Sequence, residues 1–190
     1  MNEHTNLLEI KDLTVHYVTV DGTVHAVENL NLTLPEGKTL GLVGETGAGK
    51  TTTVKAIMQI LPDPPAKILT GEVIFCGEDL LKKNKKSMRK IRGKQISMIF
   101  QDPMTSLNPV ITVGEQIMEV IRLHDKKISK KDAYTKACEM LELVGIKADR
   151  AGDYPHQFSG GMKQRVIIAM ALACNPPLLW MLRSRRRCWS

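Results

Sequence analysis

One stretch decides the fold of this chain: Gly44-Glu45-Thr46-Gly47-Ala48-Gly49-Lys50-Thr51. It matches the pattern of a phosphate-binding loop, G-x-x-x-x-G-K-[ST]. Its glycines let the backbone curl so that successive N–H groups can point at phosphate oxygens. The apolar run at residues 39–43 predicts a buried strand before the loop, and residues 51–61 predict a helix after it. This context favours a phosphate-binding loop over the alternative, a glycine-rich turn before an ordinary helix.

Composition and charge are those of a soluble globular chain. The 190 residues are 43% hydrophobic and 25% charged, enough for one domain or for a domain with a subdomain. The net charge of +7 is compatible with nucleic acid, anionic lipid or nucleotide partners. We interpret the basic clusters at residues 82–94 and 126–131 as solvated faces and loops. The longest strongly apolar stretch, residues 166–174, is too short to cross a bilayer, so membrane association would be peripheral.

The four cysteines are widely spaced, at Cys76, Cys138, Cys174 and Cys188. No Cys-x-x-Cys pair occurs, which argues against a zinc or iron–sulfur site built from them. Without a disulfide framework or a secretory signal, the chain fits a reducing, cytosolic compartment.

Periodic apolar residues predict the elements around the loop. Residues 7–34 alternate apolar and polar side chains and predict a small antiparallel sheet, with strands at residues 8–13, 24–27 and 30–34. Two further strands are predicted at residues 71–75 and 95–100. Helices are predicted at residues 79–92, 114–123, 133–144 and 162–173, and Ser129 and Asp132 have the spacing of an N-cap box.

Three positions outside the loop are candidates for ligand contacts. Tyr17 lies at the end of the first predicted strand and could stack on adenine, the alternative being a half-buried strand tyrosine. Gln101 follows a predicted buried strand, at the end where α/β sheets place ligand groups. Ser159 is a suitable N-cap, and Ser159-Gly160-Gly161 predicts a second anion-binding nest at a helix start.

Two longer segments carry a family resemblance. Residues 100–109 read Phe-Gln-Asp-Pro-Met-Thr-Ser-Leu-Asn-Pro, and residues 154–165 read Tyr-Pro-His-Gln-Phe-Ser-Gly-Gly-Met-Lys-Gln-Arg. Together with the phosphate loop, they resemble the ATP-binding subunits of ABC transporters, and more narrowly those of dipeptide and oligopeptide importers. The resemblance runs from about residue 7 to residue 179. Importers of nickel and other small solutes share much of the pattern.

The resemblance implies an α/β fold, a P-loop NTPase (RecA-like) core with an N-terminal antiparallel β subdomain and an ABC-type α-helical subdomain. It implies that residues 1–111 form the nucleotide-binding core with its β subdomain. Residues 112–175 would form the helical subdomain with the signature motif. Residues 176–190 would begin the second core strand and end in an aberrant basic tail, so that the C-terminal part of the core is missing.

The resemblance also implies residue roles. Tyr17 matches the aromatic residue that stacks on adenine, and Gln101 matches the catalytic-loop glutamine that senses Mg²⁺ and the γ-phosphate. Thr51 and Gln101 would be the Mg²⁺ contacts. The motif Ser159, Gly160 and Gly161 would close over ATP bound to the opposite subunit. The ATP phosphates would be held by the run Gly44, Glu45, Thr46, Gly47, Ala48, Gly49, Lys50, Thr51 and Thr52.

The implied partners follow from the same family. A second ATP-binding subunit, a paralogue or a second copy, would pair head to tail with this one around two nucleotides. The permease subunits would be contacted directly and an external solute-binding protein only indirectly, and no nucleic acid is expected. The chain would lie at the cytoplasmic face of the plasma membrane as a peripheral subunit.

The pattern departs from the family after residue 179. Family members continue into Asp-Glu-Pro-Thr-Thr-x-Leu-Asp, where the aspartate holds Mg²⁺ and the glutamate polarises the attacking water, and a switch histidine follows later. In this sequence no acidic residue follows Asp153. We predict a frameshift near Leu179, because residues 183–189 can encode Glu-Pro-Thr-Thr-x-Leu when each codon is read from its third base. The alternative is a genuine short variant with a basic tail.

Three functional hypotheses follow. The first is the ATP hydrolase subunit of an ABC importer that takes up dipeptides or oligopeptides, or alternatively nickel or another solute. The second is a truncated, non-hydrolytic remnant of that subunit, which would be poorly soluble alone and would not turn over ATP. The third is a soluble ABC ATPase acting on nucleic acid, which the absence of a long heptad insertion between Thr51 and Ser159 disfavours.

Overall fold

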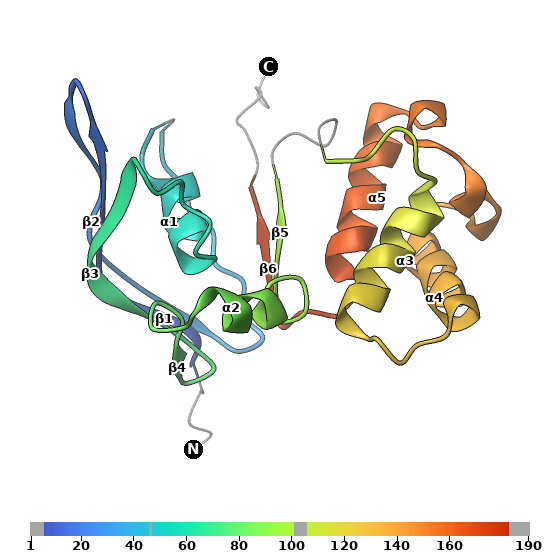
Figure 1. Ribbon diagram of the computed structural model, residues 1–190, viewed down its shortest axis with the longest axis horizontal. Helices are drawn as coiled ribbons and strands as arrows, with labels where there is room; N and C mark the ends of the chain where they lie inside the picture. The colour runs from blue at the N-terminus through green and yellow to red at the C-terminus, as the bar shows by residue number, and fades with distance from the viewer. Residues whose placement is uncertain (1–5, 46, 101–105, 183–190) are drawn as a thin grey trace. The chain divides into compact units, whose positions relative to one another are not determined.

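The computed structural model describes residues 6–45, 47–100 and 106–182 (Figure 1). The chain divides into two compact units, Met1–Arg89 and Lys90–Ser190, and each is described by itself. The helix α2, Lys85–Ile91, lies at the boundary between them. None of the described helices is long and apolar enough to cross a membrane.

The first unit is built on an antiparallel sheet in the order β2-β1-β3-β4. Its strands are β1 (Asn6–Thr19), β2 (Gly22–Pro35), β3 (Ala66–Phe75) and β4 (Glu78–Asp79). Inward-facing side chains of β1 and β3 make the core of this unit, and Leu8, Leu13 and Val73 are fully buried. The predicted antiparallel sheet is confirmed.

The prediction of separate strands at residues 24–27 and 30–34 was wrong, because both lie in the single strand β2. The pairing of β1 with β2 shifts register between Leu13 and Val15, opposite Leu30 and Val27. Asn29 takes a φ of 45°, a left-handed conformation that asparagine tolerates. The chain therefore absorbs the irregularity in a bulge instead of breaking the strand.

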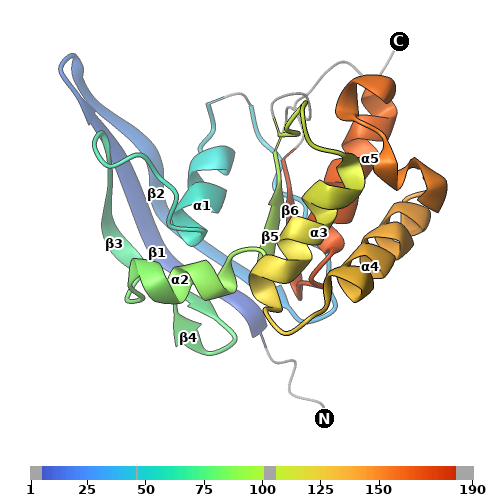
Figure 2. The same cartoon turned by 45° about the vertical axis from the view of Figure 1, so that its right-hand side comes forward.

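The helix α1, Lys50–Ile57, follows the glycine loop and lies against β1 and β2 (Figure 2). Val54, Ala56 and Ile57 are buried on its inner face. The predicted helix after the loop is confirmed, although it ends earlier than residue 61.

The predicted buried strand at residues 39–43 is not formed. Leu40 is 43% exposed and Val43 is 81% exposed, and neither of the sheets in the described ranges includes this segment. A strand needs neighbours for its N–H and C=O groups and cover for its faces. The segment is largely apolar, but the prediction of a strand was wrong because none of the described strands pairs with it.

The second unit contains a two-stranded parallel sheet and a group of helices. The strands β5 (Ile96–Ile99) and β6 (Leu178–Met181) pair in register, with Ile96 opposite Leu178. The long crossover that parallel strands require holds the helices. These are α3 (Val113–His124), α4 (Lys130–Leu143), η1 (Ala148–Gly152), η2 (Pro155–Gln157) and α5 (Gly160–Leu172).

The helices of this unit enclose their own core. Ile117, Ala137, Leu141 and Val166 are fully buried in one apolar cluster. Gly114 permits the close approach of η1 to α3, because a Cβ there would lie 2.8 Å from the Ala151 carbonyl oxygen. The long helices predicted after residue 112 are confirmed, and the strand predicted at residues 95–100 is confirmed as the shorter β5.

Candidate functional site

The glycine loop is shaped by two residues in left-handed conformations. Gly47 has a φ of 91° and Gly49 a φ of 75°. At Gly49 a Cβ would lie 2.2 Å from the Ala26 carbonyl oxygen and 3.2 Å from a methyl group of Val27, both in β2. A residue with a side chain therefore does not fit at position 49. Glycine at this position lets the loop pack against β2.

Lys50 is the first residue of α1 and turns back over the loop. Its Nζ donates hydrogen bonds to the carbonyl oxygens of Gly44, at 2.6 Å, and Glu45, at 2.5 Å. An ammonium group carries three donors, so one remains for an anion while the loop carbonyls hold the other two. The first turn of α1 contains no acidic residue, so the positive end of the helix dipole is not offset locally.

The loop was expected to leave its backbone N–H groups pointing at phosphate oxygens, but two of them donate to carbonyl oxygens within the loop. The Ala48 N–H donates to the Glu45 carbonyl oxygen at 3.1 Å, and the Gly49 N–H donates to that of Gly47 at 2.8 Å. These amides are satisfied within the loop, so a phosphate would replace carbonyl acceptors to bind them. Thr51 and Thr52 lie half-buried in the first turn of α1, and Thr46 lies outside the described residues.

Tyr17 is brought to the same place by β1. Its hydroxyl oxygen lies 3.4 Å from the Thr52 Oγ1, and its ring is half-buried. The structure thus joins a residue far away in the sequence to the helix that begins at the glycine loop. The role of Tyr17 as an adenine platform stays a prediction.

The predicted second nest begins α5 in the other unit. The Ser159 Oγ accepts a hydrogen bond from the Met162 N–H at 3.4 Å, and Ser159 is the N-cap. Gly160 and Gly161 are exposed, and a Cβ on either would meet nothing within 4 Å. Packing inside the chain does not require these glycines, which leaves the surface free for close approach by another group. Gln101 lies outside the described residues.

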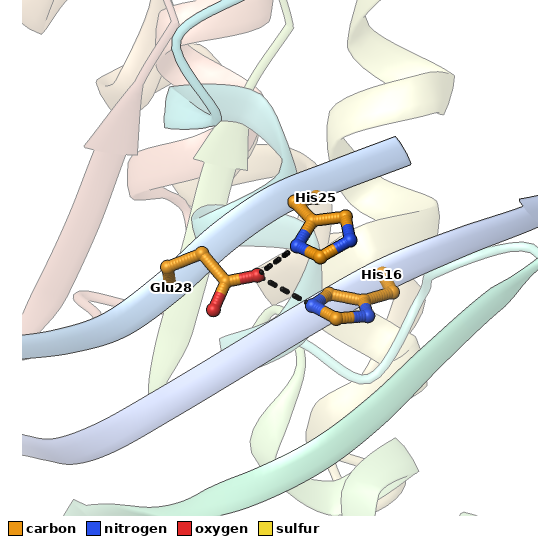
Figure 3. Close-up of side chains that lie close together, drawn as sticks. All are labelled: His16, His25 and Glu28. Atoms are coloured by element: carbon orange, nitrogen blue, oxygen red, sulfur yellow. Dashed lines mark hydrogen bonds and ion pairs between the residues drawn. The ribbon is translucent and has the colours of Figure 1, made fainter. Parts of the chain in front are cut away.

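A cluster that no sequence motif indicated lies on β1 and β2. His16 and His25 both contact the Oε1 atom of Glu28, at 2.5 Å and 2.7 Å (Figure 3). The hydrogen bond from His16 lowers the pKa of the Glu28 carboxyl, with a further contribution from His25. His25 and Glu28 are three residues apart, a spacing that places side chains on opposite faces of a regular strand. The sequence pattern therefore did not predict that these side chains would meet.

Comparison with known proteins decides the family. The sequence profile described as "ABC transporter" matches residues 27–181, which include the glycine loop, α5 and β6. The chain belongs to the ABC transporter family. The glycine loop and the Ser159-Gly160-Gly161 segment both lie within the matched residues.

Curated relatives are peptide-transport proteins. The chain is 53% identical over 177 residues to the oligopeptide transport ATP-binding protein OppD of Bacillus subtilis. It is 49% identical over 175 residues to the dipeptide transport ATP-binding protein DppD of the same species, and 50% identical to OppD of Escherichia coli. The matches cover 91–92% of this chain but 49–52% of those proteins, so the chain spans about half their length.

Solved structures confirm the α/β cassette fold. The ATP-binding cassette MJ0796, solved as a dimer in a post-hydrolysis state bound to ADP and Pi, superposes with a TM-score of 0.81 at 28% identity. That match covers 92% of this chain and 72% of the cassette. CbiO1 of Clostridium perfringens, part of the cbiONQ transporter complex, matches with a TM-score of 0.75 at 25% identity, over 93% of this chain and 64% of that one.

Proposed function

We propose that this chain is the ATP-binding part of an ABC importer subunit that couples ATP to the uptake of dipeptides or oligopeptides. The observation that carries the proposal is the glycine loop at the start of α1. There Gly49 is pressed against β2 and Lys50 is held over the loop mouth by two carbonyl oxygens. The peptide substrate class rests on the names of relatives about 50% identical to the chain. A nickel or other small-solute importer is the alternative.

The proposed nucleotide site extends beyond the loop. The third Lys50 donor would bind the β- or γ-phosphate, and the Thr51 hydroxyl would ligate Mg²⁺ together with Gln101. Tyr17 would cover the adenine ring, a role supported by its position against Thr52. The open surface over Gly160 and Gly161 would contact ATP held by a partner subunit, which their exposed positions permit.

The proposed partners are those of the family. A second ATP-binding subunit would pair head to tail with this one, as an identical copy or a paralogue, and MJ0796 was solved as a dimer. Permease subunits would bind the unit that contains α3, α4 and α5, and the assembly would lie at the cytoplasmic face of the membrane. An external solute-binding protein would deliver the substrate, and nucleic acid is not a proposed partner.

Hydrolysis is proposed for the family's complete site but not for these 190 residues alone. The family uses an aspartate and a glutamate after the second core strand, whereas no acidic residue follows Asp153 in this sequence. Loss of a general base costs about 10²–10⁴-fold in rate. We therefore propose that this polypeptide binds Mg·ATP without turning it over. The proposed frameshift stays a prediction, which sequencing the coding DNA after residue 179 would test.

Equilibrium binding of a fluorescent ATP analogue with Mg²⁺ tests the loop. The substitution Lys50→Met should weaken binding at least 10-fold, by about 1.4 kcal/mol or more, because it removes the cation from the phosphates. The matched control is Lys55→Met, in the last turn of the same helix, which should leave binding unchanged. Equal affinities of the wild type and Lys50→Met would contradict the proposal.

A further inference from the structure

The register of the first hairpin brings three potential metal ligands together. His16 of β1 lies directly opposite His25 of β2, and Val15 lies opposite Val27. Ala26 is thus an extra residue on β2, a bulge that reverses the alternation of side chains. Glu28 therefore reaches the same face as His25, and both imidazoles point at its carboxylate (Figure 3).

We propose that His16, His25 and Glu28 form a binding site for a divalent transition-metal ion, best matched by Zn²⁺. The donors are His16 Nε2, His25 Nδ1 and a carboxylate oxygen of Glu28, which all lie within 4.8 Å of one another. Imidazole and carboxylate are the ligand types of zinc sites with three protein ligands and an open fourth position. Hard ions such as Mg²⁺ prefer all-oxygen ligands, so the two histidines disfavour them.

The distances permit this coordination with small movements. Zinc lies about 2.0–2.1 Å from nitrogen and oxygen ligands, so tetrahedral neighbours lie roughly 3.3 Å apart. The contacts of Glu28 Oε1 with His16 and His25, at 2.5 Å and 2.7 Å, must lengthen by less than about 1 Å to admit the ion. Side-chain rotation suffices, because the donors already converge on one point.

Burial and charge also suit an ion. The His16 side chain is 15% exposed and would be a fixed ligand, whereas Glu28 and His25 are 48% and 62% exposed and leave a path for entry. A glutamate side chain in water is ionised at neutral pH, so Glu28 supplies a negatively charged ligand beside the two imidazoles. The alternative is a hydrogen-bonded His–Glu–His group without metal, and the experiment below separates the two.

A metal here would tie β1 to β2 beside the proposed nucleotide site. His16 directly precedes Tyr17, so the ion would fix the strand segment that carries the proposed adenine platform. Because the ion binds the folded chain, it should also raise the thermal midpoint of unfolding as its concentration rises. This metal site is independent of the proposed peptide-importer function.

The test uses the purified 190-residue chain after treatment with a chelator. Co²⁺ absorption should report one bound ion with nitrogen and oxygen ligands, and competition of Zn²⁺ against a chromophoric chelator should give the affinity. His25→Gln and Glu28→Gln should each weaken Zn²⁺ binding at least 10-fold. The matched control His156→Gln, at an exposed histidine of η2, should not.

Several results would overturn the proposal. These are the absence of stoichiometric binding, a thiolate charge-transfer band in the Co²⁺ spectrum, or a His156→Gln variant that loses affinity as His25→Gln does. Where a variant fails to fold by circular dichroism, the wild-type Co²⁺ spectrum decides the ligand type by itself. A nitrogen and oxygen spectrum supports the site and a thiolate spectrum rejects it.

Discussion

At the scale of single residues, three glycines allow the cost of a left-handed backbone to be measured apart from the cost of steric overlap. They are Gly41, Gly47 and Gly49. At Gly41 a Cβ meets nothing within 4 Å and φ is ordinary, whereas Gly47 has a positive φ but open space. Gly49 has both a positive φ and a Cβ position 2.2 Å from the Ala26 carbonyl oxygen. The cost of alanine should therefore rise along this series.

Urea unfolding of the Gly→Ala variants checks this order. We expect Gly41→Ala to change the free energy of unfolding by less than about 0.5 kcal/mol. Gly47→Ala should cost about 1–2 kcal/mol, the price of a left-handed conformation for a residue with a side chain. Gly49→Ala should cost more than Gly47→Ala, and equal costs at these two positions would contradict the packing of the loop against β2.

Asp79 gives the first unit a dependence on acid. Burial raises the pKa of its carboxyl, but the Lys82 ammonium and the backbone amides of Leu81 and Val73 outweigh burial and leave the pKa lowered. A lowered folded pKa means that stability is full above the unfolded value of about 3.9 and is lost as pH falls through the folded pKa. Acid titration of unfolding should show a smaller loss below about pH 4 in Asp79→Asn than in the wild type. Identical slopes would refute this.

At the scale of elements, α4 depends on its N-terminal cap. The Ser129 Oγ accepts from the Asp132 N–H at 3.1 Å and donates to the Asp132 carboxylate at 2.7 Å, which confirms Ser129 as the N-cap at the spacing read from the sequence. Ser129→Ala should lower the free energy of unfolding by about 1 kcal/mol. Thr135→Ala, in the exposed interior of the same helix, is the control and should be neutral or stabilising. A cost at Thr135 equal to that at Ser129 would contradict the cap's importance.

Local signals predicted some elements better than others. The helices α3 and α4 have apolar stripes and N-caps within their own residues, and α5 has an N-cap and an apolar composition, so these sequences were sufficient. The union of two predicted strands in β2 depends on the left-handed conformation of Asn29, for which the sequence carries no strong signal. The strand predicted at residues 39–43 is not formed because a strand needs another segment to pair with. The composition of residues 39–43 does not show whether such a segment lies beside them.

The candidate sites show the same division. The glycine loop before α1 was predictable because one spacing pattern sets its glycines, lysine and threonine, and its binding of phosphate stays a prediction. The position of Tyr17 beside Thr52 depends on how β1 packs on α1, and only the structure places them together. The His16 cluster depends on the bulge at Ala26, which hides the shared face of His25 and Glu28 from any regular period.

At the scale of the whole molecule, the chain belongs to the ABC transporter family and contains the glycine loop at which we propose nucleotide binding. The family, the cassette fold and the peptide-transport relatives agree with the resemblance read from residues 100–109 and 154–165. The chain spans about half the length of those relatives, so transport, partners and turnover stay proposals. For these residues by themselves we propose nucleotide binding at the loop before α1.

Phosphorus NMR of Mg·ATP mixed with the purified 190-residue chain tests the proposed nucleotide site, because one spectrum reports both binding and hydrolysis. We expect that the β- and γ-phosphate resonances shift or broaden as protein is added, that Lys50→Met abolishes this change, and that no inorganic phosphate signal grows. Resonances that stay as in free Mg·ATP would contradict the proposed binding site. A steadily growing phosphate signal, retained through purification and lost in Lys50→Met, would contradict the proposal that these residues bind ATP without turning it over.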